Sequence, residues 1–447
     1  MGKTKILTSQ IGIPEIQDIN VYMKNGGYAS IEKALKTLTP DEVVEEVKAS
    51  GLRGRGGAGF PTGMKWSFID KKSGKPRYLV CNADESEPGT FKDRYLMSEN
   101  PHLLIEGMIV ASYALGANTS YIYIRGELLY VLRILEKAIA QAYEKGLLGK
   151  NILGTDYSLD LHVAPGGGAY ICGEETALIE SLEGKRGNPR NKPPFPAVSG
   201  LYNCPTVVNN VESIAATPWI VLNGGAEYAK IGVGKSTGTK LISACGHIKK
   251  PGIYEIELGV PVEEFLYSDE YCGGIRDGHQ LKAVVAGGSS VPILPAALIL
   301  KTANGENRLM SYEGLSDGGF ATGTMLGSGG FIAMDETTCI VRNTWNFTRF
   351  YHHESCGQCS PCREGTGWME KVLHRIEHGH GTIKDIDLLV DITKQIEGRT
   401  ICPLGDAAAW PVASAVRHFR EEFEWHITNP IEASKKGAVY KKESVLV

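Results

Sequence analysis

Hydrophobic and polar positions follow two alternating periods between residues 39 and 163. Short apolar runs, typical of buried strands, are separated by segments with the period of an amphipathic helix. The predicted strands are 77–81, 121–124 and 159–163, and the predicted helices are 40–50, 100–116 and 127–145. Strands that alternate with helices indicate a parallel sheet covered by helices. The fold class predicted for this region is α/β.

The pattern changes twice after residue 239. Short strands at 240–246, 252–259 and 282–288 predict a small β-rich module. After a glycine-rich stretch that ends at Gly330, the periodicity becomes helical, near 339–352, 362–377, 383–396 and 405–423. Residues 1–38 show weak periodicity and are expected to wrap the surface. The predicted domains are therefore 1–38, 39–238, 239–330 and 331–447.

Composition limits the classes of function. The chain has 447 residues, of which 42% are hydrophobic, enough for sizeable cores, and a net charge of −4 without a basic stripe argues against nucleic acid as a partner. The apolar stretch 291–300 is interrupted by proline and is too short to span a membrane. Six cysteines show no pairing pattern and no leader is apparent, so we expect a reducing compartment; they are Cys81, Cys172, Cys204, Cys245, Cys272 and Cys339.

Four other cysteines have the spacing of an iron-sulfur site. Cys356, Cys359 and Cys362 are each two residues apart, and Cys402 follows with a proline directly behind it. Such a set can hold one [4Fe-4S] cubane. Zinc is the weaker alternative, because structural zinc sites usually pair two Cys or Cys/His hooks. The adjacent His352 and His353 are not expected to be ligands, since four thiolates complete the cage.

A glycine-rich loop follows the first predicted helix. Gly54, Gly56 and Gly59 match the dinucleotide fingerprint formally, but a helix precedes them where the fingerprint requires a strand. Glycines still allow backbone N–H groups to approach an anion or a flat ring. Positive charge would come from Arg53, Arg55 and Lys65. An ordinary surface turn remains the alternative.

Acidic residues gather at the ends of two predicted strands. Asp84, Glu85 and Glu87 follow the first strand, which is more charge than a solvated turn needs, although an acidic surface turn stays open. After the third strand, a second glycine loop is followed by Glu174 and Glu175 at a predicted helix start. The favourable interaction of an acidic side chain with the helix dipole is enough to explain one glutamate at this position, but not two. The pair therefore predicts the wall of a ligand site.

Two further segments carry candidate ligand contacts. The stiff loop 186–196 could present Lys192 and Phe195 to a nucleotide by charge and stacking, although a proline-rich linker is an equal alternative. Asn209 and Asn210 are predicted at a helix start, where amides suit phosphate or ring contacts.

Together these runs resemble the NADH-oxidising flavoprotein subunit of respiratory complex I over nearly the whole chain. The segments that carry the resemblance are 51–63, 81–90, 167–175, 188–196, 208–210 and 354–363. The resemblance implies that FMN is held by Gly54, Gly56, Gly57, Lys65, Asn82, Asp84, Tyr170, Glu174, Asn209 and Asn210. It implies NADH contacts from Phe60, Glu87, Glu175, Lys192 and Phe195, with catalytic roles for Glu87 and Glu175.

The resemblance also implies a fold and a function. The fold would be a Rossmann-like parallel sheet with helices, a ubiquitin-like β-grasp insert, and a C-terminal helical bundle that carries a [4Fe-4S] cluster. NADH would pass hydride to FMN, and electrons would leave singly through the cluster toward quinone. Expected partners are a small thioredoxin-like [2Fe-2S] subunit and a larger multi-cluster subunit, on the cytoplasmic side of the inner membrane with no direct span.

Two alternative functions share parts of these motifs. The flavoprotein (diaphorase) subunit of an NAD-linked hydrogenase or formate dehydrogenase shares the same core. Those relatives often carry cysteine-bearing extensions, and this chain has no cysteine before Cys81 or after Cys402, which favours complex I. The alternative from another class is a non-redox scaffold in which the cysteines hold zinc.

Overall fold

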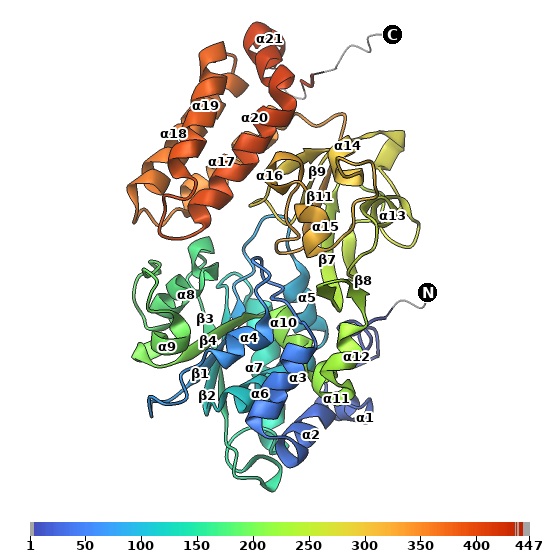
Figure 1. Ribbon diagram of the computed structural model, residues 1–447, viewed down its shortest axis with the longest axis vertical. Helices are drawn as coiled ribbons and strands as arrows, with labels where there is room; N and C mark the ends of the chain where they lie inside the picture. The colour runs from blue at the N-terminus through green and yellow to red at the C-terminus, as the bar shows by residue number, and fades with distance from the viewer. Residues whose placement is uncertain (1–3, 434, 436–437, 441–447) are drawn as a thin grey trace. The chain divides into compact units, whose positions relative to one another are not determined.

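The computed structural model describes residues 4–433, 435 and 438–440 (Figure 1). The chain divides into two compact units. The first unit contains the chain up to Ser86, Thr90–Ile242 and Ile253–Gly259; the second contains Glu87–Gly89, Ser243–Gly252 and the chain from Val260 onward. Residues 1–3, 434, 436–437 and 441–447, which belong to the predicted N-terminal and helical segments, lie outside the described residues.

A parallel four-stranded sheet forms the centre of the first unit, as the alternating pattern predicts. Its strands are β1 (Tyr78–Ala83), β2 (Thr119–Ile124), β3 (Asp160–Pro165) and β4 (Thr206–Asn210), in the order β3-β2-β1-β4. Every neighbouring pair is parallel. The helices α6 (Pro101–Leu115) and α7 (Leu129–Glu144) connect β1 to β2 and β2 to β3. Both helices pack against the sheet, which buries its apolar strands on a continuous core.

Most of the other helices of the first unit lie around this sheet (Figure 1). They are α3 (Pro40–Ala49), α4 (Thr62–Ser67), α5 (Lys92–Glu99), α8 (Glu175–Leu182), α9 (Pro196–Ser199), α10 (Val211–Ala215), α11 (Thr217–Asn223) and α12 (Gly225–Ala229). Helix α3 starts where the sequence predicts: Thr39 and Glu42 form a reciprocal capping box that satisfies backbone N–H groups at the helix start.

The N-terminal segment contains more regular structure than its weak periodicity indicates. It forms helices α1 (Ile19–Lys24) and α2 (Ala29–Thr37). The preceding residues are held by Glu255, whose carboxylate accepts the backbone N–H groups of Ile6, Leu7 and Thr8 at 2.8, 2.9 and 2.9 Å. This anchor joins residues about 250 positions apart in the sequence, so no local pattern could reveal it.

A mixed five-stranded sheet follows, in the order β10-β9-β11-β7-β8. The strands are β7 (Thr239–Gly246), β8 (Gly252–Glu257), β9 (Leu281–Ala286), β10 (Ile293–Pro295) and β11 (Gly330–Asp335). Three of them, β7, β8 and β9, were predicted. Strand β11 was not predicted, because it begins at the end of a glycine-rich stretch; it pairs parallel to β7 and antiparallel to β9.

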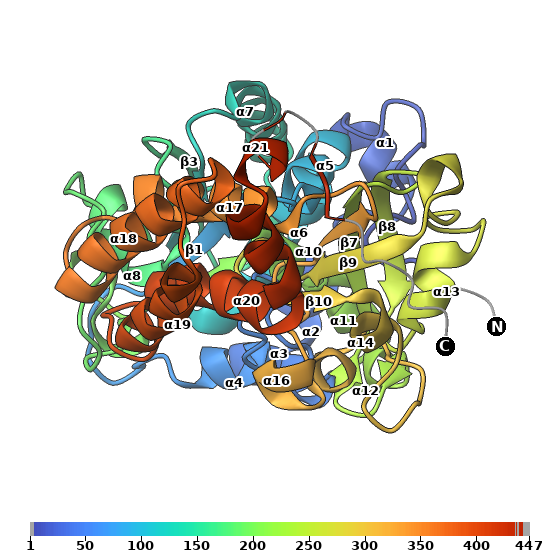
Figure 2. The same cartoon turned by 90° about the horizontal axis from the view of Figure 1, so that it is seen from above.

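The C-terminal part of the second unit is helical, as predicted (Figures 1 and 2). Its main helices are α17 (Ile340–Glu354), α18 (Ser360–Glu377), α19 (Ile383–Ile396) and α20 (Leu404–Thr428), which pack against one another. Shorter helices include α13 (Val262–Tyr267) and α14 (Ala296–Leu300). Among the described residues, no helix combines the length and the apolar character needed to cross a bilayer.

Candidate functional site

The carboxyl ends of β1 and β4 form the centre of the candidate ligand site. The two strands are in register, so that Cys81 lies opposite Asn209 and Asn82 opposite Asn210. The chain runs from β1 outward to β2 and β3, and then returns to place β4 on the other side of β1. The carboxyl ends of the neighbouring strands β1 and β4 therefore form a topological switch point, the position at which open parallel sheets bind ligands. The predicted amides lie at this position.

The segment 206–210 corrects one expectation. Asn209 and Asn210 were predicted at a helix start, but the segment is strand β4, and only Asn210 serves as the N-cap of α10, with its side chain accepting from the N–H of Glu212. The apolar run is too short for its pattern to separate a strand from a helix. Pairing with β1 decides between the two.

The first glycine loop is closed at its base and lies against β4. The N–H of Gly54 donates to Phe60 O, and that of Thr62 donates to Leu52 O, each at 2.8 Å. A Cβ atom on Gly56 would lie 3.0 Å from the Cβ of Asn210. A glycine is therefore needed for the loop to approach the strand end this closely.

Arg55 does not supply charge to a ligand, contrary to the expectation from the sequence. It is 1% exposed, and its guanidinium donates to the carbonyl of Thr237 at 2.7 Å and to the hydroxyl of Tyr228 at 3.3 Å. Its backbone N–H donates to the hydroxyl of Ser213 at 2.8 Å. Arg55 thus fixes the glycine loop to the interior of the first unit.

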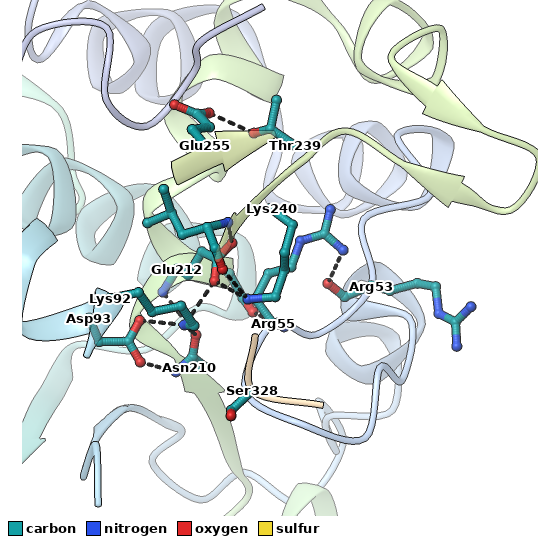
Figure 3. A network of polar contacts seen from close by, with 12 residues as sticks. Arg53, Arg55, Lys92, Asp93, Asn210, Glu212, Thr239, Lys240, Glu255 and Ser328 are labelled. Atoms are coloured by element: carbon teal, nitrogen blue, oxygen red, sulfur yellow. Dashed lines mark hydrogen bonds and ion pairs between the residues drawn. The ribbon is translucent and has the colours of Figure 1, made fainter. Parts of the chain in front are cut away.

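Asn210 is held by a buried network of charges (Figure 3). Its side-chain amide donates to Asp93 at 2.7 Å, and its side-chain oxygen accepts from Lys92 at 3.3 Å. Lys92 also pairs with Asp93 at 2.7 Å and with Glu212 at 2.8 Å. Lys240 completes the network by its contact of 2.6 Å with Glu212. The network leaves the Asn210 side chain little rotational freedom.

Burial and ion pairing oppose each other in this network. Burial lowers the pKa of Lys240 to about 7, since the attraction of Glu212 only partly offsets the loss of water. Burial alone would raise the pKa of Glu212, but Lys240 and Lys92 outweigh it and hold that pKa below its ordinary value. For Lys92 the two acids Asp93 and Glu212 outweigh burial, so its pKa is raised. Lys92 therefore remains a cation beside the strand ends.

The other amides are held just as firmly. The buried indole of Trp66, on α4, donates to the side-chain oxygen of Asn209 at 2.8 Å. The amide of Asn82 donates to the carbonyl of Gly173 at 2.8 Å, and its oxygen accepts the N–H of Asp84 at 3.1 Å. These bonds join the ends of β1 and β4 to the helix that follows the glycine loop and to the segment before α8.

Two glutamates and two lysines form a chain of ion pairs at the start of α8. Glu174 is the N-cap of this helix and accepts from the backbone N–H groups of its first turn. Lys65 lies 2.7 Å from Glu175, and Lys192 lies 2.9 Å from both glutamates. Burial would raise the pKa of Glu175, but the attraction of Lys65 and Lys192 outweighs it and lowers that pKa to about 2. Glu175 is therefore ionised at neutral pH.

The remaining predicted ligand contacts fall in different places. Phe60 and Phe195 are 47% and 58% exposed, so their rings are free to stack on a planar ligand. Tyr170 lies in the short 3-10 helix Tyr170–Gly173 that precedes α8. Glu87 belongs to the second unit, where its carboxylate accepts the N–H of Ser290 at 2.7 Å.

Glu85 corrects the interpretation of the acidic turn. It is 5% exposed, and its carboxylate accepts the N–H of Asp93 at 2.6 Å and that of Arg94 at 3.1 Å. The Arg94 guanidinium adds a bond of 2.9 Å. Glu85 therefore caps α5 rather than lining a ligand site.

The four predicted metal ligands lie at helix starts in the second unit. Cys356 and Cys359 lie between α17 and α18, Cys362 is in the first turn of α18, and Cys402 lies two residues before α20. Burial raises the pKa of Cys362 to about 11, and the thiols of Cys359 and Cys356 contribute to the increase, which indicates that the three are neighbours. The positive end of the α18 dipole favours thiolates there.

Three positioning residues had almost no signal in the sequence. Trp66 follows the glycine loop but resembles an ordinary apolar helix residue, and Lys92 with Asp93 resembles a solvated pair. Only the tertiary structure shows that all three are buried and contact the strand-end amides.

Comparison with known proteins first defines the class. Residues 47–219 match the family model described as the Nuo51 FMN-binding domain. Residues 342–426 match the NADH-ubiquinone oxidoreductase-F iron-sulfur binding region. The chain thus combines a flavin-binding type of domain with an iron-sulfur type of domain.

The relatives then define the family. The chain is 50% identical to the F-subunit 2 of the NADH-quinone oxidoreductase of Rhizobium meliloti, over 94% of its own length and 97% of that protein. It is 50% identical to the corresponding F-subunit of Mycobacterium tuberculosis over 95% and 94% of the two chains. The chain belongs to the family of NADH-quinone oxidoreductase F-subunits. A solved NAD⁺-reducing [NiFe]-hydrogenase is 35% identical, with a TM-score of 0.81 over 95% of this chain and 67% of that one.

Proposed function

We propose that this chain is the electron-input subunit of an NADH:quinone oxidoreductase. The observation that carries the proposal is the pairing of a switch-point site, lined by amides, glycines and an ionised acid-lysine chain, with a four-cysteine set on the same polypeptide. Both parts coincide with the matched family regions. Family membership excludes the zinc scaffold as the leading interpretation.

The residues around the switch point fit FMN. Gly56 and Gly57 offer backbone N–H groups without side chains in the way, and Gly54, whose N–H is bonded to Phe60 O, contributes the space that a missing side chain leaves. Asn82, Asn209 and Asn210 are held rigidly at the strand ends. Asp84, Tyr170, Glu174 and Lys65 complete the proposed set. When bound, FMN supplies the chemistry of accepting two electrons as hydride and releasing them singly. The protein's part is to orient the ring and to limit its motion.

The acid-lysine chain and the exposed rings fit the dinucleotide. Phe60 and Phe195 would stack on its planar groups, while Lys192 and Glu175 would contact its polar ones. Glu87 is proposed as a further contact. Glu175 and Glu87 are the proposed catalytic pair; as a fixed carboxylate, Glu175 would orient the donor rather than move a proton.

The cysteines fit a [4Fe-4S] cluster better than zinc. The proposed donor set is four thiols, the ligand type of a cubane, and the positive end of the α18 dipole opposes the effect of burial, which raises the pKa of Cys362. Cys356, Cys359, Cys362 and Cys402 would hold the cluster.

The assembly follows from the same proposal. Electrons would pass to a small thioredoxin-like [2Fe-2S] subunit and a larger multi-cluster subunit, in the peripheral arm on the cytoplasmic side of the inner membrane. The Rossmann-like sheet would belong to the flavin domain (39–238), strands β7 to β10 of the mixed sheet to a ubiquitin-like β-grasp insert (239–330), and residues 331–447, which include nearly all of strand β11, to the helical iron-sulfur domain.

The electron acceptor that the chain can use distinguishes an electron-input subunit from a complete quinone reductase. The anaerobically purified chain, alone or with a small cluster-bearing partner, should contain FMN, iron and acid-labile sulfide, and should reduce ferricyanide with NADH. Quinone should be a poor acceptor, because the proposed assembly places quinone chemistry in other subunits. Rapid quinone reduction by the chain alone would contradict the proposed role as an input subunit. A preparation that contains neither FMN nor iron would contradict the proposed redox function altogether.

The second candidate is the flavoprotein subunit of an NAD-linked hydrogenase. The likeness to the NAD⁺-reducing hydrogenase supports it, although the identity is lower than to the NADH-quinone oxidoreductase relatives. Isolation of the tagged chain from its own cells decides between them: subunits of a membrane quinone reductase are expected to copurify, whereas a nickel-iron hydrogenase subunit would favour the second candidate.

A further inference from the structure

A buried cluster of metal-ligating side chains lies in the helical part of the second unit. Cys339, Glu422 and His426 each offer one ligand atom, and these atoms lie within 4.8 Å of one another. Their residues are 7%, 1% and 0% exposed. Neither the proposed four-cysteine ligand set nor the proposed flavin site includes these three residues, although Glu422 and His426 fall within the matched iron-sulfur region.

Two helices bring this cluster together, and a third lies beside it. Cys339 is the N-cap of α17, and Glu422 and His426 lie four residues apart on one face of α20. Glu377, the last residue of α18, lies beside them. Cys362 is in the first turn of α18 and Glu377 is its last residue, so the two are about 22 Å apart along the helix axis at about 1.5 Å per residue. The cluster is therefore separate from the proposed [4Fe-4S] site.

The distances within the cluster suit a tetrahedral ion. Cys339 Sγ lies 3.2 Å from His426 Nε2. Ligand bonds of about 2.3 Å for sulfur and about 2.0 Å for nitrogen would separate the same two atoms by about 3.5 Å, so a small movement admits the ion. One oxygen of Glu422 accepts the N–H of Ile340 at 2.8 Å and the other lies 2.8 Å from Lys282. A carboxylate retains further lone pairs for a cation.

The second nitrogen of His426 is the observation that points to a ligand. Nδ1 is buried and has no hydrogen-bond partner among the described residues. Glu377 Oε2 lies 3.7 Å away, too far for a hydrogen bond but near enough to receive one after a slight shift. A carboxylate on the far nitrogen is the arrangement that orients a metal-bound histidine. Arg342 pairs with the same Glu377 and balances its charge.

The protonation of the ring agrees with this arrangement. Burial, together with the charges of Arg342 and Lys282, lowers the pKa of His426 to about 4. The imidazole is therefore neutral at physiological pH, the form that binds metals.

We propose that Cys339, Glu422 and His426 form a structural zinc site, with Glu377 orienting His426. Zinc suits the set because it accepts sulfur, nitrogen and carboxylate ligands in tetrahedral geometry, with a water in the fourth position. On binding, the S–H bond of Cys339 breaks, a sulfur–zinc bond forms, and one proton passes to solvent. The ion would join the start of α17 to α20 and, through Glu377, to the end of α18.

The test measures zinc in the full chain purified with its FMN and iron. We expect about one zinc per chain, measured by elemental analysis beside iron, and at least a tenfold loss in Cys339→Ser and His426→Gln with iron unchanged. Glu377→Gln should weaken zinc binding by about 10- to 100-fold. Cys272→Ser, which removes another buried cysteine, is the matched control and should retain both metals.

X-ray absorption at the zinc edge separates this site from zinc misplaced in the cysteine set. One sulfur with nitrogen and oxygen neighbours supports the proposal, whereas four sulfurs, or zinc that disappears in Cys356→Ser, overturns it. Zinc below about one-tenth per chain, both as purified and after dialysis against excess Zn²⁺, also overturns it. The zinc content and the X-ray absorption spectrum of the wild-type chain test the proposal even if Cys339→Ser fails to fold.

Discussion

At the scale of single residues, Glu175 shows how neighbouring charges define a role. The residue is mostly removed from water, which would favour the neutral acid. Lys65 at 2.7 Å and Lys192 at 2.9 Å reverse that preference. The result is a fixed carboxylate between two ammonium groups, suited to hold a polar part of the donor and unsuited to exchange protons near neutral pH.

Replacing Glu175 by Gln should lower kcat/KM for NADH by about 10- to 100-fold, because charge-assisted bonds contribute about 1.5–3 kcal/mol each. The low-temperature electron paramagnetic resonance signal of the cluster should stay unchanged. Glu136→Gln, in an exposed ion pair on α7, is the matched control and should behave as wild type. A full activity in Glu175→Gln would remove this residue from the site.

The pKa of Glu175 also predicts how stability and NADH oxidation depend on pH. The pKa of Glu175 is about 2 in the folded chain, below its ordinary value, so its ion pairs contribute stability above pH 4.5 that is lost as the pH falls toward 2. NADH oxidation between about pH 5 and pH 8 should therefore show no acid limb from Glu175. An acid limb in wild type that disappears in Glu175→Gln would contradict this.

A substitution of Cys402 tests whether this single residue is a ligand of the proposed cluster. Cys402→Ser should lose or degrade the cluster, seen as a loss of its electron paramagnetic resonance signal after reduction, while FMN stays bound. The reason is that Cys402 belongs to the second unit and the proposed flavin residues to the first. Cys245→Ser is the control. An unchanged signal in Cys402→Ser would exclude Cys402 from the ligand set.

At the scale of elements, helix α4 positions the end of β4. The glycine loop leads directly into α4, and the indole of Trp66 donates to Asn209. The bond is buried, so the amide oxygen has little access to water if the donor is removed. Helix and strand are thereby held in one arrangement at the switch point.

Trp66→Phe should lower the free energy of unfolding by about 1–3 kcal/mol, the cost of leaving a buried acceptor unpaired. It should also weaken FMN binding, because Asn209 loses its orientation. Denaturation and flavin fluorescence measure the two effects. Trp368→Phe, at a 55% exposed position on α18, is the control and should change neither. Equal FMN affinity in Trp66→Phe would mean that Asn209 is not oriented by the indole.

At the scale of the whole molecule, the chain joins a hydride site to a one-electron site. The first unit holds the proposed flavin residues and the second holds the four cysteines. The division into a flavin domain, a β-grasp insert and a helical domain remains a prediction. The preference for NADH or NADPH as the electron donor depends on the charges of the assembled site.

NADPH should be a poorer donor than NADH by at least about tenfold in kcat/KM. Its additional phosphate brings roughly two negative charges toward Glu174 and Glu175. Lys65 and Lys192 could attract that phosphate only by leaving the carboxylates that they already pair with. Initial rates with both donors under equal salt provide the measurement, and comparable efficiencies would contradict this placement of the acids.

The sequence alone determined the features that depend on short-range chemistry. The period of apolar residues predicted β1, β2 and β3 with their helices, and Thr39 with Glu42 marked the start of α3. Cysteine spacing indicated the cluster, since ligands on one turn must be close in sequence. The motifs together were also sufficient to recognise the family.

Only the tertiary structure decided how distant residues share their charges and hydrogen bonds. Arg55 and Glu85 looked like ligand contacts, yet one is buried against Thr237 and the other caps α5. The pairing of β4 with β1, and the meeting of Cys339 with His426, join positions more than 80 residues apart. A side chain's partner across such a separation is selected by packing of the whole chain, and no local pattern contains that information.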